Sequence, residues 1–372
     1  MGKSGLRALR TDIHGRECEI SGISSQAGSN SRIAEDRDAR REKESEAASG
    51  YPTTVNVPGL QCNISSSGPD SPSYLEILGH GELLRRAGML EEKLSHCDLC
   101  PRRCGVDRNS GKTGYCRVDN RLKIAAINLH PWEEPPISGT GGSGTIFFSG
   151  CTLGCIFCQN YPISQLGVGR EMSAEDLAGS MLALQEKGAH NINLVTSAHQ
   201  MASFVRALAI AAGKGLKIPI VYNSSGYESL ETLAILEGVV DIYLPDIKYS
   251  CSRTALRLSG AADYTEHNRR ALLEMWRQVG SLVVDSRGIA RKGMIVRHLV
   301  LPGGLAGTQE SLSYLASEIG PDVWVSLMNQ YFPAHKGPSH PPLDRKTTEE
   351  EYEAAFDALV SLGLLNGFTQ EC

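Results

Sequence analysis

The chain of 372 residues lacks any apolar run of about eighteen residues, and its start lacks the apolar core of a signal peptide. We therefore expect a cytoplasmic protein without a membrane span. A basic excess is also missing, since 37 Lys and Arg stand against 42 Asp and Glu, which argues against a nucleic-acid partner. Cysteine, in contrast, is plentiful: the chain has 11. In a reducing compartment, clustered cysteines favour metal binding or catalysis over disulfides.

The first seventy or so residues are poor in aromatic side chains and rich in Ser, Gly and mixed charges. Such a composition buries too little apolar surface to offset the entropy lost on ordering. We expect residues 1–72 to be a disordered or weakly ordered N-terminal extension. Residues 73–140 form a second, cysteine-rich segment, and residues 141–372 form the main domain.

A repeating pattern runs through the main domain. Six times, a short apolar run rich in β-branched residues precedes a longer amphipathic segment. The six runs are TIFFSG (145–150), NINLVTS (191–197), KIPIVYN (217–223), DIYLPDIKY (241–249), GMIVRHLVLP (293–302) and VWVSLMNQ (323–330). Strands alternating with helices predict an α/β fold with a parallel sheet and right-handed crossovers. Both an open doubly wound sheet and a barrel-like sheet fit this pattern.

Polar residues stand at the carboxyl ends of these otherwise apolar runs, where ligands gather in parallel sheets. The fourth run carries Asp246 and Lys248, which are two residues apart and therefore share one face. Two interior charges are costly unless they are paired or bind a ligand. A buried ion pair without a binding role is the alternative. In the fifth run Arg297 and His298 point to opposite faces, so one faces the interior and the other a covering helix.

Three cysteines, Cys151, Cys155 and Cys158, follow the first run with the spacing C-x3-C-x2-C. One interpretation is a zinc ion closed by a fourth ligand, such as His130 or His199. The other is an iron–sulfur cluster in which three thiolates leave one iron open. Buried free thiols are the third possibility.

This loop, with Phe157 before its third cysteine, resembles the radical S-adenosylmethionine (radical SAM) superfamily. The segments HPWEEPPISGTGGSGTIFFSGCTLGCIFCQNYPIS, VYNSSGYES, LPDIKY, VRHLVLPGG and MNQYFP resemble its branch related to pyruvate formate-lyase activating enzyme (PflX-like). The resemblance implies a partial (β/α)6 TIM-like barrel and an oxidoreductase. The loop cysteines would hold a 4Fe-4S cluster shielded on one side by Phe157. S-adenosylmethionine would chelate the open iron, and its cleavage would yield a 5′-deoxyadenosyl radical that abstracts hydrogen from a substrate.

The resemblance also implies roles for residues at the other strand ends. Asn223, Ser225 and Gly226 would line the S-adenosylmethionine site. Asp246 and Lys248 would lie close to the cofactor, and the Arg297 guanidinium would reach the methionyl carboxylate. The implied partners are S-adenosylmethionine, a reducing protein such as flavodoxin or ferredoxin, and a glycyl-radical enzyme as the target. A peptide, a metabolite or RNA is the alternative target, and a non-catalytic zinc-binding module is the alternative function.

One departure from the resembled branch concerns the second strand end. A Gly-Gly-Glu sequence that meets the methionyl amine is absent, and TSAHQ (196–200) stands in its place. Thr196 or Ser197 could meet the amine, while His199 could face substrate or lie on the surface at a helix start. Upstream, Glu133 and Glu134 either edge the site or are solvated.

A second group consists of Cys97, Cys100, Cys104 and Cys116, spaced C-x2-C-x3-C-x11-C. Four cysteines are enough for a closed zinc site or a second iron–sulfur cluster. Reduced structural thiols are the alternative. Between them, Arg102 and Arg103 are expected to be a solvated basic pair.

Overall fold

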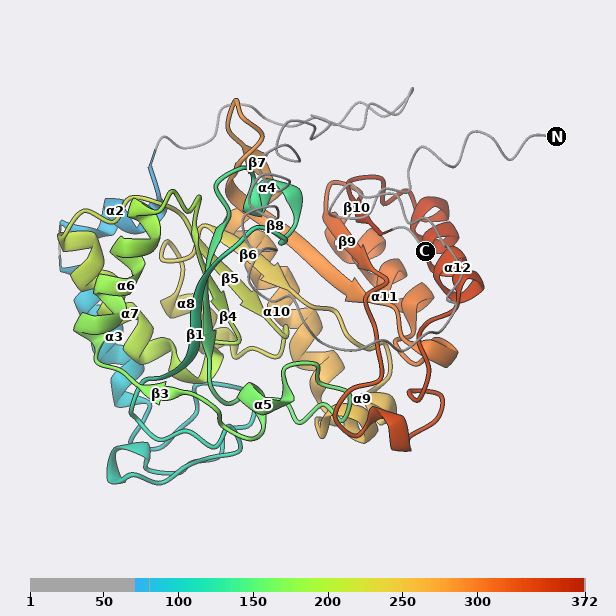
Figure 1. Cartoon of the computed structure of the whole chain (residues 1–372), viewed down its shortest axis with the longest axis horizontal. Coiled ribbons are helices and arrows are strands. Elements are labelled where there is room, and N and C mark those ends of the chain that lie inside the picture. The colour runs from blue at the N-terminus through green and yellow to red at the C-terminus, as the bar shows by residue number, and fades with distance from the viewer. Residues whose placement is uncertain (1–70, 80, 371–372) are drawn as a thin grey trace, which may run out of the picture.

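The computed structural model describes residues 71–79 and 81–370. The expected N-terminal extension lies outside this part, apart from its last two residues. Figure 1 shows an α/β fold around one mostly parallel sheet. Among the described residues the strand order is β10-β9-β8-β6-β5-β4-β2-β1-β3, and β7 pairs with β8. This arrangement agrees with the partial barrel that the resemblance implies.

All six apolar runs of the sequence are strands, and each pairs in parallel with the next one along the repeat. The expected parallel sheet is therefore confirmed. The six strands are β2 (Ser143–Phe148), β4 (Ile192–Val195), β5 (Ile220–Ser224), β6 (Ile242–Pro245), β8 (Ala290–Leu299) and β9 (Trp324–Met328). The main helices between and after them are α6 (Ala174–Glu186), α7 (Met201–Gly213), α8 (Leu230–Ile235), α10 (Tyr264–Val279), α11 (Thr308–Tyr314) and α12 (Glu349–Ser361).

Local sequence explains where two of these helices begin. The Ser173 hydroxyl accepts a hydrogen bond from Asp176 N at 3.0 Å, while the Asp176 carboxylate accepts one from Ser173 N. Thr348 and Glu351 form the same reciprocal cap at the start of α12. Such capping boxes satisfy N–H groups that a helix start leaves without partners.

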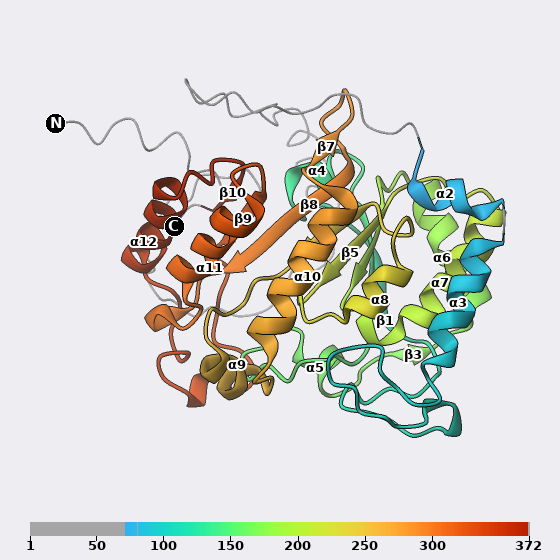
Figure 2. The same cartoon turned by 180° about the vertical axis from the view of Figure 1, so that it is seen from behind.

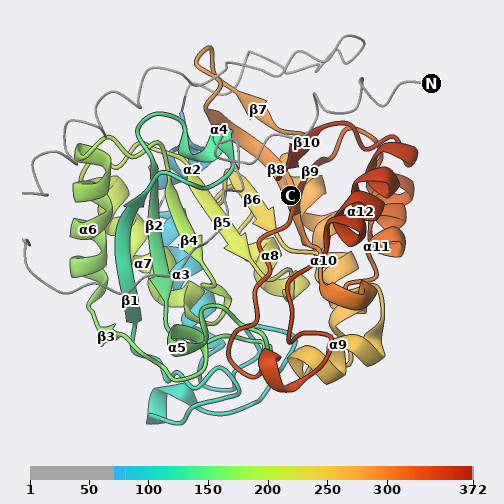
Figure 3. The same ribbon diagram turned by 45° about the vertical axis from the view of Figure 1, so that its right-hand side comes forward.

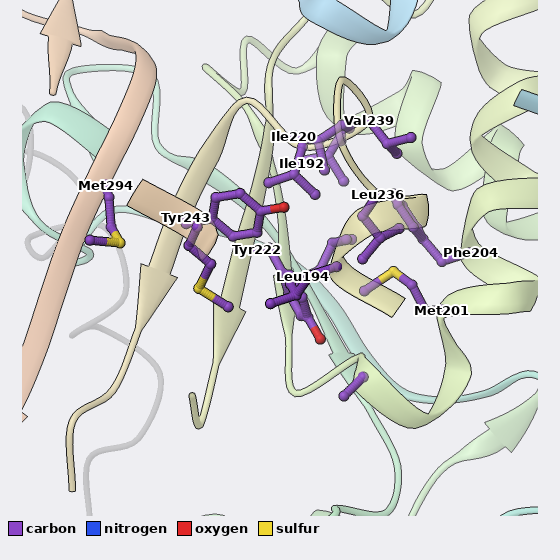
Figure 4. Close-up of a cluster of buried hydrophobic side chains, with 14 of the residues drawn as sticks. Ile192, Leu194, Met201, Phe204, Ile220, Tyr222, Leu236, Val239, Tyr243 and Met294 are labelled. Atoms are coloured by element: carbon purple, nitrogen blue, oxygen red, sulfur yellow. The ribbon is translucent and has the colours of Figure 1, made fainter. Parts of the chain in front are cut away.

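The largest apolar core lies between the sheet and its covering helices. Figure 4 shows Ile192, Leu194 and Tyr222 on this side of the sheet, with Met201 and Phe204 of α7 facing them. Helices α2 (Ser73–Leu78) and α3 (Glu82–Glu92) extend the layer and contact α7 (Figure 2). Because alternate strand residues point to opposite faces, the residues between these apolar ones point into the barrel.

Four further strands were not expected from the sequence: β1 (Lys123–His130), β3 (Arg170–Glu171), β7 (Val283–Val284) and β10 (Gly367–Thr369). Strand β1 belongs to the cysteine-rich segment but pairs antiparallel with β2, so this segment and the main domain share one sheet. His130 pairs with Ser143, which places the end of β1 beside the start of β2. The chain then continues through Glu133 and Glu134 into α4 (Pro135–Ser138).

The two ends of the sheet differ. Helices α5 (Tyr161–Ser164) and α9 (Ser252–Ser259) lie at the end toward which the parallel strands point, together with the loops of the cysteine-rich segment (Figure 1). Helix α4 and strand β7 lie at the opposite end (Figures 1 and 3). No helix in the described part of the chain is long and apolar enough to cross a membrane.

Candidate active site at the carboxyl ends of the strands

The three loop cysteines follow β2, and the sulfur of each has a hydrogen-bonding neighbour. Cys151 Sγ accepts from the Leu153 N–H at 3.3 Å, and Cys155 Sγ accepts from the Ser259 hydroxyl at 3.0 Å. Cys158 Sγ lies 3.2 Å from Ser164 Oγ. Donors to sulfur stabilise thiolates and orient metal ligands. The loop therefore offers three cysteine sulfurs, each with a hydrogen-bonding neighbour, and this arrangement suits a cluster with one open iron.

A cluster of buried apolar side chains, called the apolar bed below, packs against this loop. Cys151 and Cys155 pack against a buried cluster that includes Leu153, Phe157 and Tyr331. The Phe157 ring meets the Tyr331 ring edge to face, with centroids 6.0 Å apart. Burial raises the pKa of Cys151 to about 12, and burial also raises the pKa of Cys155, although the nearby Lys248 opposes that shift. Ligation would therefore displace protons from these thiols.

Four predicted residues from three neighbouring strand ends form one polar network. Lys248 Nζ lies 2.5 Å from Asp246 Oδ2, and Arg297 Nε donates to Asp246 Oδ1 at 3.0 Å. Arg297 Nη2 donates to Asn223 Oδ1 at 2.6 Å. Burial alone would raise the pKa of Asp246, but Lys248 and Arg297 together lower it below its usual value. One carboxylate thus holds two cations in place at the carboxyl end of the sheet.

Arg297 and His298 behave as their alternation predicts. Arg297 faces the interior network, whereas His298 contacts Ile247 O at 2.7 Å and Thr308 Oγ1, at the start of α11, at 2.9 Å. Burial lowers the pKa of His298 to about 4, so its ring is neutral near pH 7. His298 therefore joins the sheet to a covering helix.

Two residues of α10 that sequence reasoning missed fix the third strand end against the fourth. Tyr264 OH donates to Ser225 O at 2.9 Å, and Asn268 Nδ2 donates to Asp246 O at 2.9 Å and to Gly226 O at 3.2 Å. Tyr264 and Asn268 are four residues apart and therefore share one face of the helix. That shared polar pair on a helix face was the only signal the sequence offered.

Gly226 allows this close approach. Its φ is +70°, and a Cβ there would overlap Asn268 Nδ2 and Asp246 O. We expect Gly226→Ala to lower the free energy of unfolding by about 3 kcal/mol or more, since it combines backbone strain with a clash. Gly238→Ala is the matched control, because Gly238 also has a positive φ (+74°) but has open space around it. Urea unfolding of both variants measures the difference, and equal losses would contradict the steric argument.

The second strand end has an unusual backbone. Thr196 has φ +61°, which is rare for a β-branched residue and is a form of strain concentrated at functional sites. Its N–H donates to Asn223 O at 3.0 Å, which ties this turn to the network. The Ser197 hydroxyl is buried and has no partner among the described residues. Thr196 and Ser197 thus adjoin the network, and their roles toward a methionyl amine stay predictions.

His199 lies beneath the cysteine loop, so the surface interpretation was wrong. It is 1% exposed, and its Nε2 lies 2.7 Å from Ser149 O. Burial lowers the pKa of His199 to about 4, so the neutral ring donates to the Ser149 carbonyl. Arg108 Nη1 in turn donates to His199 O at 2.6 Å. His199 therefore supports the backbone from which the loop begins.

Arg102 of the cysteine-rich segment forms a hydrogen bond with the same loop. The Arg102 guanidinium donates to Thr152 O at 2.8 Å and to Gly260 O at 2.6 Å, and lies 3.7 Å from the centre of the Tyr115 ring. The expected solvated basic pair is therefore wrong for Arg102. Arg103 is exposed and forms an ion pair with Glu231 at 2.7 Å.

Neither cysteine group is arranged, among the described residues, to hold a single metal ion. Within residues 71–79 and 81–370, no three His, Cys, Asp or Glu side chains are gathered closely enough to hold one metal ion. Zinc holds its sulfur ligands at about 2.3 Å and needs such a gathering. The loop fits a larger cluster by its donors and apolar bed. A metal at the second group stays a prediction for its four cysteines: Cys97, Cys100, Cys104 and Cys116.

A three-thiolate loop at the end of the first parallel strand, beside a buried charged network, is suited to an enzyme that uses an iron–sulfur cluster. Residues 145–303 match the family model described as "Radical SAM superfamily". The uncharacterized protein MJ0674 of Methanocaldococcus jannaschii is 30% identical over 271 residues, which cover 70% of this chain and 73% of that protein. The uncharacterized protein MJ0808 of the same organism is 28% identical over 113 residues, covering 25% and 33%. The chain belongs to the radical SAM superfamily.

Membership of the radical SAM superfamily implies a general chemistry. Enzymes of this superfamily use a 4Fe-4S cluster, S-adenosylmethionine and an external electron donor. The loop cysteines and the charged network lie where those groups are expected, at the carboxyl ends of the strands.

Proposed function

We propose that this chain is a radical SAM oxidoreductase in which Cys151, Cys155 and Cys158 hold the 4Fe-4S cluster. The observation that carries the proposal is the set of hydrogen-bonding neighbours around all three sulfurs, next to the Asp246 network. When bound, the cluster and S-adenosylmethionine would supply a 5′-deoxyadenosyl radical that takes a hydrogen atom from the substrate. The protein would bind and orient the substrate and the cofactor, and it would exclude water from the site.

Each part of the site has a task in this proposal. Arg297 and Lys248 are the cations available to the methionyl carboxylate, and Asp246 holds both in fixed positions. Thr196 and the Ser197 hydroxyl are proposed to meet the methionyl amine in place of the missing acid, since that hydroxyl has no partner within residues 71–79 and 81–370. The apolar bed under Cys151 and Cys155 keeps water from one side of the cluster.

We further propose a role like that of the pyruvate formate-lyase activating enzymes, with flavodoxin or ferredoxin as the electron donor and a glycyl-radical protein as the target. The segments quoted from the sequence support this branch, and the names of the two relatives state no activity. A peptide, metabolite or RNA target would use the same cysteine loop and the same network.

Anaerobic reconstitution tests the general proposal. Protein loaded with iron and sulfide is expected to release methionine and 5′-deoxyadenosine when dithionite and S-adenosylmethionine are added. Release is measured by liquid chromatography, and cluster content by iron, zinc and acid-labile sulfide analysis. Absence of release from fully loaded protein would contradict the proposal, and zinc without sulfide would favour the metal-module alternative.

A further inference from the structure

A layer of polar side chains crosses the inside of the barrel. Strand register places Thr145 beside Asn193, Asp246 beside Arg297, and Arg297 beside Ser326, so that each pair shares the inward face. The parallel strands β2, β4, β5, β6, β8 and β9 each contribute one such residue, and the one from β6, Asp246, directly follows its last residue. The six are Thr145, Asn193, Asn223, Asp246, Arg297 and Ser326. An interior this polar is costly unless its groups find partners.

Two carboxylates reach this layer from the connection between β1 and α4. Glu133 Oε2 lies 3.8 Å from Arg297 Nη1, and the Glu133 side chain is 11% exposed. Glu134 is only 2% exposed. The connection is held in place because Glu133 N donates to Ser138 Oγ at 2.7 Å and Ile137 N donates to Glu134 O at 2.8 Å. The sequence left open whether these acids are solvated, and the structure places them at the interior.

The charges in this layer do not balance. Three carboxylates, Glu133, Glu134 and Asp246, face two cations, Lys248 and Arg297. Both cations are already engaged by Asp246, and Arg297 is also bonded to Asn223. Burial and then the neighbouring Glu134 raise the pKa of Glu133 to about 7. The cation that faces the two glutamates, Arg297, is therefore shared with Asp246.

Polar atoms without partners gather in the same place. Among the described residues seven buried side-chain atoms lack a hydrogen-bond partner, and four of them belong to this layer: Glu134 Oε2, Asn193 Oδ1, Asn193 Nδ2 and Ser326 Oγ. Asn193 is 0% exposed and close enough to Glu133 to lower the pKa of that carboxyl. Each unmet group costs about 1–3 kcal/mol. Four such atoms around two acids that share one cation with Asp246 point to a missing ligand.

We propose that this interior layer binds the substrate through a protonated amine or guanidinium group, which Glu133 and Glu134 hold. Asn193 has both an unmet acceptor and an unmet donor among the described residues, so the substrate also carries a hydroxyl or amide group, which can both donate and accept, beside its cation. A metal ion fits less well, because no three suitable ligands gather in the described part of the chain. The layer shares Asn223, Asp246 and Arg297 with the Asp246 network, and Arg297 contacts both Glu133 and Asp246. This assignment rests on the proposed radical function for its meaning as a substrate site.

The test uses two probes of nearly the same shape. Ethylguanidinium carries the proposed cation, and ethylurea is its neutral counterpart. Isothermal titration calorimetry on the full, reconstituted chain with S-adenosylmethionine is expected to give at least about tenfold tighter binding of ethylguanidinium. Glu133→Gln and Glu134→Gln should each weaken that binding about tenfold or more. Glu92→Gln, at the exposed end of α3, is the matched control and should bind as the unchanged protein does.

Several outcomes would overturn the assignment. The assignment is wrong if both probes bind equally or if neither binds. It is also wrong if Glu133→Gln and Glu134→Gln leave the affinity for ethylguanidinium unchanged. If a glutamate variant folds poorly by circular dichroism, Asn193→Leu serves in its place and is expected to weaken ethylguanidinium binding. Probe binding does not depend on radical chemistry. Selective binding of ethylguanidinium without deoxyadenosine release would support this inference and contradict the proposed function. Deoxyadenosine release without selective binding would support the proposed function and contradict this inference.

Discussion

Cys155→Ala is expected to reduce 5′-deoxyadenosine release by more than about a hundredfold, to the level of the reaction without protein. Cys155 is the middle cysteine of the loop and a proposed cluster ligand. Its sulfur accepts a hydrogen bond from the Ser259 hydroxyl and lies near Lys248. Two remaining thiolates cannot hold the cluster as three do. The measurement is deoxyadenosine yield after anaerobic reconstitution, together with the visible absorbance and electron paramagnetic resonance of the reduced protein.

Cys251→Ala is the matched control for this loss. Cys251 is exposed and belongs to neither cysteine group, so the variant should keep both the yield and the cluster signals. Survival of deoxyadenosine release in Cys155→Ala would remove the loop from the catalytic centre. Equal losses in both variants would instead indicate a general sensitivity to the number of cysteines.

The six parallel strands could be predicted because each is encoded locally by a short apolar, β-branched run. Their sequential order was implied by the partial barrel of the resembled family, because the repeating pattern alone also fits a doubly wound sheet. The site followed from the same rule, since polar residues that end apolar runs come together at one edge of a parallel sheet. Asp246, Lys248 and Arg297 meet for this reason, although they lie up to about fifty positions apart in the sequence.

Other parts of the site had no local signal. Strand β1 is an antiparallel addition whose residues are mostly half-buried or exposed, so its pattern did not resemble that of the buried parallel strands. Without β1, the sequence left open whether Glu133 and Glu134 edge the site or are solvated. Arg102 looked solvated because its partners are backbone carbonyls far along the chain, at Thr152 and Gly260. A charged side chain whose partners are distant carbonyl groups cannot be distinguished by sequence from one in water.

Asp246→Asn is expected to lower the free energy of unfolding by about 3 kcal/mol near pH 7 and to weaken S-adenosylmethionine binding. A neutral amide leaves Lys248 and Arg297 as two partly buried like charges, and breaking such a pair costs far more than the pair itself contributes. Urea unfolding gives the first quantity, and equilibrium binding to the reconstituted protein gives the second. Glu266→Gln, which removes an exposed ion pair with Arg270 on α10, should cost less than about 1 kcal/mol.

The pH dependence of the free energy of unfolding distinguishes an electrostatic contribution of Asp246 from a contribution made by its packing. Lys248 and Arg297 hold the folded-state pKa of Asp246 below its usual value, so the unfolded chain takes up this proton first as the pH falls. The contribution is therefore complete above the unfolded-state pKa of about 3.9 and is lost as the pH falls through the lower folded-state value. The difference between the unchanged protein and Asp246→Asn should shrink below about pH 4. It should also decrease as the pH rises through about 7, because the Asp246 charge contributes to the raised pKa of Glu133. A difference that stays constant into acid would mean that Asp246 acts by packing, and Arg297 would then need another counterion, for which Glu133 is the nearest candidate.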